Sequence, residues 1–306
     1  MSSDFHEKSY ESHSRLYEEH ARGSDKHGKA QKWLLQNTVD AWRHNRKLAL
    51  LKPLLEAWQD HRWITVGDGR YGQEAHYIQQ NGGRAVATDI SDTLLEESAG
   101  AGYISEYSRQ NAESLSYPDN EFDLAVCKES LHHFPRPMVA LYEMIRVSKK
   151  AVVLIEPTDL KIGATLRWKL FRALVDTARK ITGRSGGHQI FEEAGNYVYA
   201  ISRLEMEKVA LGMNMPAIAV KGINDYYVKG LEEVKADRSS RAFKKVRRRI
   251  VMNDLFCRLG FKPHSTTCVI LLHQPIESDI QDRLSEAGFE IVDLPENPYI
   301  DKGRDS

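Results

Sequence analysis

The stretch Trp63-Ile64-Thr65-Val66-Gly67-Asp68-Gly69-Arg70-Tyr71-Gly72 decides the fold of this chain. Its first four residues are apolar or β-branched and predict a buried strand, and residues 73–80 predict the helix that follows. Between them, Gly67, Gly69 and Gly72 form a GxGxxG loop. Such glycines permit a tight turn and let a ligand approach the backbone, while the start of the helix offers unpaired N–H groups. The stretch therefore predicts a nucleotide-binding strand, loop and helix.

A carboxylate follows the loop at the place where a ribose would be held. Asp89 comes directly after the next predicted strand, residues 85–88. There it can accept hydrogen bonds from both hydroxyls of a ribose, so the loop and Asp89 together predict an adenosine-type ligand. Nicotinamide and flavin dinucleotides use the same geometry. In the alternative structural interpretation, the loop is only a tight turn and Asp89 is a helix cap.

Asp68, between the first two glycines, bears on which nucleotide binds. A carboxylate at this position would repel a pyrophosphate, whereas it suits a ligand that carries an ammonium group and a sulfonium. The alternative is that Asp68 points to solvent.

Short apolar runs alternate with helical patterns beyond the loop, which is typical of strand-helix units that form a parallel sheet with helices on both faces. The further predicted strands are 122–126, 151–155, 217–220, 268–272 and 289–294. We divide the chain into a helical N-terminal cap (1–60), a cofactor-binding core (61–160), a helical lid insertion (161–200) and the remainder of the sheet (201–306). The last part carries a helical basic insertion and ends with a helix and a strand.

The segment that begins at Asn111 carries the most specific pattern of the chain. It reads Asn111-Ala112-Glu113-Ser114-Leu115-Ser116-Tyr117-Pro118-Asp119-Asn120-Glu121-Phe122-Asp123. It resembles the class I S-adenosylmethionine-dependent methyltransferase family, whose members often carry Asp-Ala-Glu-x-Leu-Pro-Phe-x-Asp-x-x-Phe-Asp. The resemblance runs from about residue 63 to 157 and includes the glycine loop, Asp89 and the segment Leu131-His132-His133-Phe134.

The resemblance implies a fold, a cofactor and binding residues. The fold is expected to be α/β, with a doubly wound, seven-stranded, mostly parallel Rossmann-like sheet, and the cofactor S-adenosyl-L-methionine. Asp89 is expected to hold the ribose. Asn111 and the backbone of Ala112 are expected to face the adenine, and Lys128 to lie near the methionine part.

Two residues depart from the family pattern. Asn111 replaces an acidic residue, and its amide can donate as well as accept a hydrogen bond toward adenine. Thr65 stands where an acidic residue usually ends the first strand. We therefore predict that Asp68 takes over part of the contact with the amino group of the cofactor. The predicted cofactor-binding residues are Gly67, Asp68, Gly69, Gly72, Asp89, Asn111, Ala112 and Lys128.

Methyl transfer from a sulfonium is an in-line displacement, and a general base matters chiefly when the acceptor is a hydroxyl or a protonated amine. His132 and His133 are the predicted catalytic residues because they follow the fourth predicted strand, near the expected ligand crevice. His133 is favoured as the contact, and a capping or packing role is the alternative. Glu129 and His188 are weaker candidates.

The flanks of the core supply the remaining predictions. Tyr226 and Tyr227 could line the acceptor pocket or end a strand. Tyr10 and Tyr17, with other aromatic residues of the N-terminus, could form a lid over the cofactor or pack in a core. The basic run 241–249 could hold a phosphate-bearing acceptor or RNA, or be a solvated face.

The composition of the chain disfavours several classes of binding partner. The chain has 43 Lys plus Arg and 43 Asp plus Glu, so its neutral net charge disfavours nucleic acid as a partner. No apolar run approaches the length of a membrane helix, which predicts no membrane partner. Three scattered cysteines and the lack of a secretory signal predict the cytoplasm and no metal ligands. The aromatic flanks are compatible with a homodimer.

We interpret the sequence as that of an enzyme that methylates a small molecule or sugar-containing intermediate. A hydroxyl is the first choice for the methylated group, and an amine is the second. The glycine loop and Asp89 alone also permit a dinucleotide-dependent oxidoreductase. A noncatalytic cofactor-binding partner protein is the third interpretation.

Overall fold

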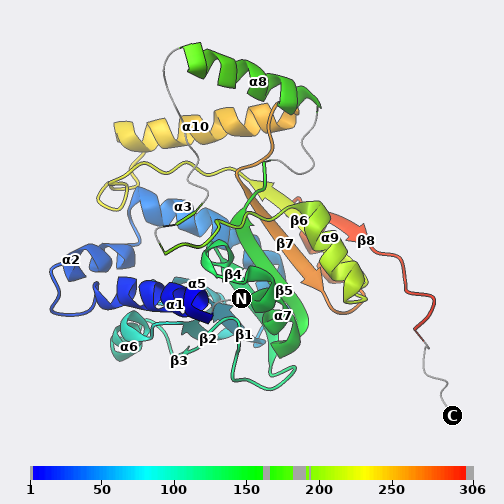
Figure 1. Cartoon of the computed structure of the whole chain (residues 1–306), viewed down its shortest axis with the longest axis horizontal. Coiled ribbons are helices and arrows are strands. Elements are labelled where there is room, and N and C mark those ends of the chain that lie inside the picture. Colours follow the sequence, from blue (N-terminus) through cyan, green and yellow to red (C-terminus); the bar gives the residue numbers. More distant parts are fainter. Residues whose placement is uncertain (1–2, 161–165, 182–190, 193, 301–306) are drawn as a thin grey trace.

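The computed structural model describes residues 3–160, 166–181, 191–192 and 194–300. One mixed sheet runs through the molecule, and its strands lie in the order β3-β2-β1-β4-β5-β7-β6-β8 (Figure 1). The strands are β1 (Arg62–Val66), β2 (Arg84–Asp89), β3 (Glu106–Arg109), β4 (Phe122–Lys128), β5 (Ser148–Pro157), β6 (Ala217–Ile223), β7 (Thr266–Leu272) and β8 (Glu290–Asp293).

The first five strands are parallel and place the predicted motifs at one edge of the sheet. β1 pairs in parallel with β2 on one side and with β4 on the other. The strand order reverses between β1 and β4, and in open parallel sheets a ligand crevice lies outside the carboxyl ends at such a point. β7 runs antiparallel to both β5 and β6, and β8 runs antiparallel to β6. The sheet is therefore doubly wound and mostly parallel, as predicted.

The strand count is eight among the described residues, so the expectation of seven was wrong. The sequence patterns locate the other seven strands but not β3. Glu106, Tyr107 and Arg109 are exposed, and only Ser108 is partly shielded at the edge of the sheet. A polar edge strand lacks the alternation of apolar residues on which such predictions depend.

Two hydrophobic clusters pack against the two faces of the sheet because neighbouring strand residues point in opposite directions. Trp63 belongs to the cluster shared with α4 (Lys52–Ala57), α5 (Gln73–Gln80) and α11 (Ser278–Glu286). Ile64 belongs to the cluster shared with α7 (Pro137–Val147) and α9 (Arg203–Gly212). The sheet is thus held between helical layers, with α6 (Thr93–Gly100) beside β3.

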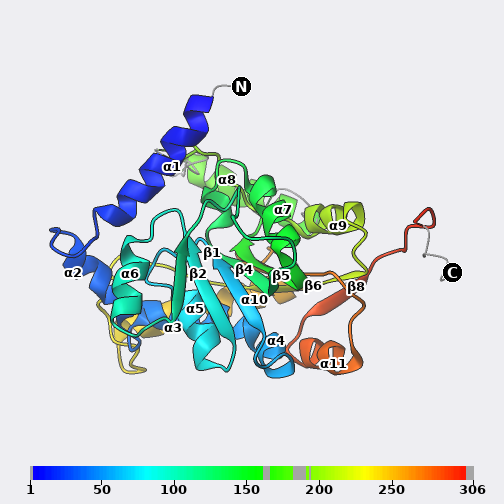
Figure 2. The same ribbon diagram turned by 90° about the horizontal axis from the view of Figure 1, so that it is seen from below.

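The N-terminal segment is helical and reaches the edge where the glycine loop lies. It comprises α1 (Ser3–Glu18), α2 (His27–Ala30), η1 (Gln31–Leu34), α3 (Val39–Leu48) and η2 (Ala49–Leu51), ahead of α4. Thr38 caps α3 by accepting a hydrogen bond from the backbone N–H of Ala41 at 3.1 Å. In Figure 2, α1 runs along one side of the molecule and carries the N-terminus at its outer end.

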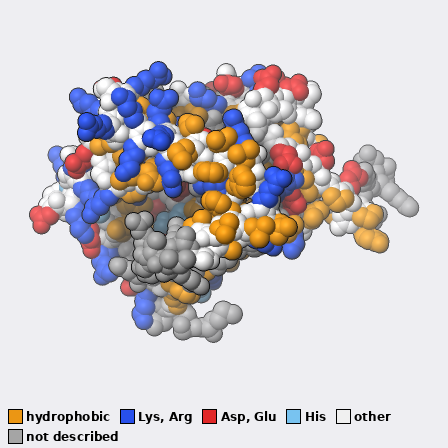
Figure 3. Space-filling view, turned by 90° about the horizontal axis from the view of Figure 1, so that it is seen from above, with side chains coloured by type: hydrophobic (Ala, Val, Ile, Leu, Met, Phe, Trp, Pro, Cys, Tyr) orange, Lys and Arg blue, Asp and Glu red, His pale blue; other side chains and the backbone are white. Residues whose placement is uncertain are grey.

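A pair of helices forms an outer layer on the opposite side of α3 from the sheet (Figure 1). α8 (Leu166–Ile181) packs on α10 (Arg241–Arg258), with the Phe171 and Phe256 ring centroids 6.1 Å apart. The predicted lid residue His188 lies outside the described residues. In Figure 3, basic side chains gather on the face of these two helices beside exposed apolar ones. None of the described helices has the length and apolar character that crossing a membrane would require.

Candidate cofactor and acceptor site

The glycine loop is packed so tightly that two of its residues have no room for a side chain. Gly67 has a φ of 80°, and a Cβ there would lie 2.8 Å from Oγ of Ser130. A Cβ on Gly69 would lie 2.6 Å from the ring of Tyr17 and 2.7 Å from Oδ2 of Asp89. Helix α1 therefore lies over the loop, with the ring of Tyr17 against Gly69.

Asp68 faces the helix that follows the loop and not the solvent. Its carboxylate accepts hydrogen bonds from the N–H groups of Glu74 at 3.2 Å and Ala75 at 3.0 Å, and from the hydroxyl of Thr65 at 2.9 Å. Burial and the neighbouring Glu74 carboxylate raise the pKa of Asp68 well above its usual value. Asp68 thus caps the start of α5, and the substitution of Thr65 for an acid supplies that cap with a hydroxyl donor.

Asp89 lies at the end of β2 with its carboxylate beside the glycine loop. The backbone N–H of Ser91 donates to its Oδ1 at 3.1 Å. Burial raises the pKa of Asp89 to about 6, although the backbone N–H groups of Ser91 and Gly69 and the nearby His13 favour its charged form. A ligand that donates hydrogen bonds here would stabilise the carboxylate.

A small cavity of about 70 Å³ joins the predicted residues to helix α1. Four of the predicted cofactor-binding residues line it: Gly67, Asp89, Asn111 and Ala112. Gly69 does not line the cavity but contacts Tyr17, which does. Gly72 has a φ of 68°, precedes α5 and packs against Ile104. The side chains that α1 adds to the cavity are Tyr10, His13 and Tyr17. We call this space the first cavity.

Tyr10 ties α1 to the loop that carries Asn111. Its hydroxyl donates to Oε2 of Glu113 at 2.6 Å, and Arg136 forms an ion pair with the same oxygen at 2.5 Å. Asn111 accepts a hydrogen bond through Oδ1 from the backbone N–H of Glu113 at 3.0 Å, and its side chain also hydrogen-bonds to Tyr10.

A larger space of about 660 Å³ adjoins the first cavity, and we call it the charged chamber. The two spaces share Gly67 and Ser130 on the core, His13 and Tyr17 on α1, and His133. Ionisable side chains dominate the rest of the wall. They include Asp40, Arg43, His44, Arg70, Glu74, Lys128, Glu129, His132, Glu192 and Glu232.

Two cationic side chains of helix α3 form buried ion pairs at or beside the chamber. Arg43 donates from Nε to Asp225 at 2.8 Å and pairs with Asp40 at 2.6 Å. Lys47, only 1% exposed, contacts Glu129 at 2.5 Å and Asp225 at 2.7 Å. Although burial opposes it, the contacts with Arg43 and Lys47 hold the pKa of Asp225 well below its usual value. These pairs fix α3 against the loop that follows β6.

Lys128 belongs to the charged chamber rather than to the first cavity. Its Nζ contacts Oε1 of Glu74 at 2.6 Å, and Nδ1 of His44 lies 3.4 Å away. Burial, with the charges of Lys128 and Lys47, lowers the pKa of His44 well below its usual value, so its imidazole is neutral. Lys128 therefore forms an ion pair with Glu74 on α5, the helix whose start Asp68 caps.

The two predicted catalytic histidines differ in their surroundings. Nδ1 of His132 lies 2.6 Å from Oε2 of Glu156, a fully buried carboxylate. The other oxygen of Glu156 accepts hydrogen bonds from the N–H groups of Ser130 and Leu131, each at 2.9 Å. Burial lowers the pKa of His132, but the bond to Glu156 outweighs it and the net shift is upward.

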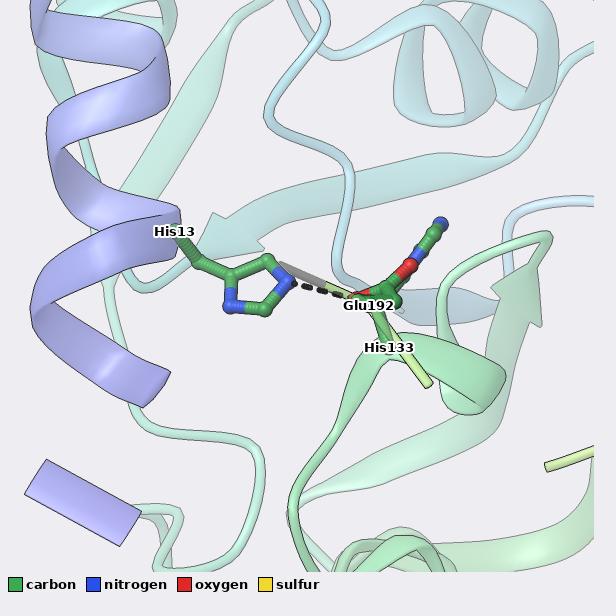
Figure 4. A group of neighbouring side chains, drawn as sticks. All are labelled: His13, His133 and Glu192. Atoms are coloured by element: carbon green, nitrogen blue, oxygen red, sulfur yellow. Dashed lines mark hydrogen bonds and ion pairs between the residues drawn. The ribbon is translucent and has the colours of Figure 1, made fainter. Parts of the chain in front are cut away.

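His133 turns instead toward a carboxylate from a distant part of the chain. Its Nδ1 lies 2.5 Å from Oε1 of Glu192, and Nε2 of His13 lies 3.5 Å from Oε2 of the same residue (Figure 4). Neither His13 nor Glu192 was among the residues predicted for catalysis. Nothing in the local sequence singles them out, because they lie far from each other and from His133 along the chain.

The other residues predicted to contact the acceptor lie in different parts of the structure. Tyr227 lines the charged chamber, with the guanidinium of Arg43 4.9 Å from its ring centre. Tyr226 instead packs beside α10 in a hydrophobic cluster with Phe243. The basic side chains of residues 241–249 are exposed and line neither cavity.

A family model described as a methyltransferase domain matches residues 64–155. No curated protein matches the chain. Among solved structures, the YcgJ protein from Bacillus subtilis is 16% identical, with 76% of this chain and 100% of that chain covered and a TM-score of 0.48. The magnesium protoporphyrin IX methyltransferase from Synechocystis with bound SAH is 12% identical, with 76% and 85% covered and a TM-score of 0.46.

The family match covers the strand, glycine loop and Asp89, together with the segment that follows Asn111. It also ends at β5, so it spans the parallel part of the sheet from β1 onward. Residues 64–155 therefore form a methyltransferase domain, whose cofactor is S-adenosylmethionine, and the order of the parallel strands fits such a domain.

Proposed function

We propose that the enzyme transfers a methyl group to a hydroxyl, or secondly an amine, of a small polar molecule such as a sugar-containing intermediate. The observation that carries this proposal is the pair of adjoining spaces with a shared wall at Gly67, Ser130 and His133. The first cavity suits the nucleoside of the cofactor, and the charged chamber suits the acceptor. A methyl donor and its acceptor must meet in line, which such a shared wall allows.

The proposed cofactor contacts follow from the lining of the first cavity. Asp89 accepts the hydrogen bonds of the ribose hydroxyls, and Asn111 with the backbone of Ala112 faces the adenine. The backbone of Gly67 lies along the methionine part. Lys128 remains a prediction for the methionine end, and Asp68 acts through the cap of α5 rather than through direct contact.

The polarity of the chamber supports a polyhydroxylated acceptor. Its wall offers carboxylates as acceptors and guanidinium, ammonium and imidazole groups as donors, within about 660 Å³. Ligands with many hydroxyl groups can hydrogen-bond to such a wall, whereas an apolar ligand would displace water from charged groups without replacing its hydrogen bonds. The chemistry of the wall therefore favours a sugar over a hydrophobic acceptor.

We propose that His132 is the base that takes the proton of the acceptor hydroxyl. Glu156 binds Nδ1 and so orients the ring, which leaves Nε2 as the atom that can take a proton. As the oxygen of the acceptor forms its bond to the methyl carbon, the carbon–sulfur bond breaks and its electron pair goes to sulfur. The products are the methylated acceptor and S-adenosylhomocysteine, with the released proton on His132.

The test combines cofactor binding with a search for the acceptor. The protein is incubated with a cell extract and either ordinary or methyl-deuterated S-adenosylmethionine, and compounds that gain a methyl group are found by mass spectrometry. We expect a sugar-containing product that is absent with His132→Gln, a variant that still binds S-adenosylhomocysteine. Cofactor binding without any methylated product would instead support the noncatalytic alternative, and a methylated apolar product would contradict the assignment of the chamber.

A further inference from the structure

Three side chains from separate segments converge on the wall between the first cavity and the charged chamber (Figure 4). His13 comes from α1, His133 from the turn after β4, and Glu192 from the segment that precedes α9. One nitrogen of each imidazole and one oxygen of the carboxylate all lie within 4.8 Å of one another. Within the described residues, this is the group of His, Cys, Asp and Glu side chains whose spacing suits a metal ion.

The hydrogen bonds of His13 fix which of its nitrogens is available. Nδ1 lies 2.8 Å from the backbone carbonyl of Ser9, which can only accept a hydrogen bond. Nδ1 therefore carries the hydrogen, and Nε2 points its lone pair toward Glu192 when the ring is neutral. Histidines that bind metals have this arrangement, with the other ring nitrogen donating to a carbonyl or carboxylate.

One pair of donor atoms has about the spacing that a metal requires, and the other pair is held closer together by a hydrogen bond. Bonds of about 2.0–2.1 Å in a tetrahedral site put neighbouring donor atoms about 3.4 Å apart. Oε2 of Glu192 lies 3.5 Å from Nε2 of His13, and Oε1 lies 2.5 Å from Nδ1 of His133. Small side-chain rotations of His133 and Glu192 would bring all three donors to a common centre.

We propose that His13, His133 and Glu192 bind one divalent first-row transition metal ion, of which Zn²⁺ is the representative. Two imidazoles and one carboxylate suit such metals, whereas Mg²⁺ prefers oxygen ligands. Three protein ligands leave coordination positions open, as in catalytic rather than structural zinc sites. All three side chains line the charged chamber, so an open position faces the space assigned to the acceptor.

The site gives the metal a role that rests on the proposed function. An acceptor hydroxyl bound by the metal loses its proton more readily, because a divalent ion stabilises the developing negative charge. The adjacent His132 takes that proton, and the metal keeps its oxidation state throughout. The metal also joins α1 to the core, so it closes the N-terminal helix over both cavities.

The experiment measures metal binding without reference to activity. The full chain, free of any affinity tag, is stripped with a chelator, dialysed, and titrated calorimetrically with Zn²⁺, Co²⁺ and Mg²⁺. We expect one equivalent of Zn²⁺ or Co²⁺ to bind, visible absorption bands from the bound Co²⁺, and no binding of Mg²⁺. His13→Ala and Glu192→Gln should each weaken Zn²⁺ binding at least about tenfold, as loss of a ligand does.

A matched control separates this site from ordinary histidine–carboxylate pairs. His27 and Glu97 lie 2.9 Å apart, and no third donor atom from the described part of the chain is grouped with them, so His27→Ala should bind Zn²⁺ as the unaltered protein does. Thermal unfolding in chelator should be alike for all variants, which shows that they fold. Equal Zn²⁺ binding by all of them, or no binding at all, overturns the metal site. If S-adenosylhomocysteine binding and methyl transfer persist in that case, the proposed function stands without the metal.

Discussion

At the scale of single residues, the proposed contact of Asp89 with the ribose should make cofactor binding depend on pH. Its carboxyl group has a pKa raised to about 6, chiefly by burial, so it is ionised at pH 7 and largely protonated at pH 5. Only the carboxylate accepts hydrogen bonds from both ribose hydroxyls. We expect the affinity for S-adenosylhomocysteine to fall about tenfold from pH 7 to pH 5, as the ionised fraction of such a group does.

The contribution of Asp89 to the stability of the ligand-free fold has the opposite pH dependence from that of a salt-bridged carboxylate. A raised pKa means that the fold without ligand favours neutral Asp89, so the stability this group contributes is present at low pH and is lost as pH rises through 6. Calorimetric titrations at several pH values measure the affinity. Asp89→Asn should bind more weakly at pH 7 and show a flat profile, which also separates Asp89 from the neighbouring His13. A slope that persists in this variant would contradict the assignment.

Gly69 is the second residue whose role is sharply testable. A methyl group there meets both the Tyr17 ring at 2.6 Å and Oδ2 of Asp89 at 2.7 Å, so neither neighbour can give way without moving α1 or the Asp89 carboxylate. Gly69→Ala should weaken S-adenosylhomocysteine binding by about tenfold or more, since a carboxylate displaced from its partners loses charge-assisted hydrogen bonds. Gly100→Ala is the control, because a Cβ there meets nothing within 4 Å. Equal affinities of the two variants would refute this packing argument.

At the scale of elements, α1 is the part of the cap that the cofactor should affect. Three of its side chains line the first cavity, and Tyr10 bonds to Glu113 across it. A ligand that fills this cavity adds contacts to α1 and opposes its local opening. We expect amide hydrogen exchange in residues 3–18 to slow when S-adenosylhomocysteine is added, with no change in α11. Unchanged exchange in α1, with slowing at the glycine loop, would show that α1 does not cover the ligand.

The elements also show what the sequence could predict. The positions of the glycine loop and Asp89 beside one cavity could be predicted because each lies in a continuous strand-loop-helix pattern, whereas the position of Asn111 followed from the family resemblance. The edge strand β3 escaped prediction because its exposed residues carry no apolar alternation. Pairs such as Arg43 with Asp225, or His133 with Glu192, lie far apart along the chain and leave no pattern within any window of sequence.

At the scale of the whole molecule, the buried ion pairs hold the cap to the sheet. Arg43 is 5% exposed and joins α3 to Asp225 in the loop after β6. Its removal takes the same cation away from the carboxylates of Asp225 and Asp40. We expect Arg43→Met to lower the free energy of unfolding by about 3 kcal/mol, the usual cost of breaking a buried pair from one side.

Denaturant unfolding followed by circular dichroism measures this loss. Arg283→Met removes a cation from the exposed pair with Asp279 and serves as the control, with no change expected in the unfolding midpoint. A similar midpoint for the two variants would mean that the ion pairs of the cap contribute no more than surface pairs do.

The central claim is that the enzyme binds the S-adenosyl group in the first cavity and its acceptor in the charged chamber. A crystal structure of the complex with S-adenosylhomocysteine tests it most directly. We expect the ribose hydroxyls on Asp89, the adenine beside Asn111 and Ala112, and the sulfur at the wall that Ser130 and His133 share with the chamber. A ribose bound away from Asp89, or a nucleoside seated in the charged chamber, would contradict it.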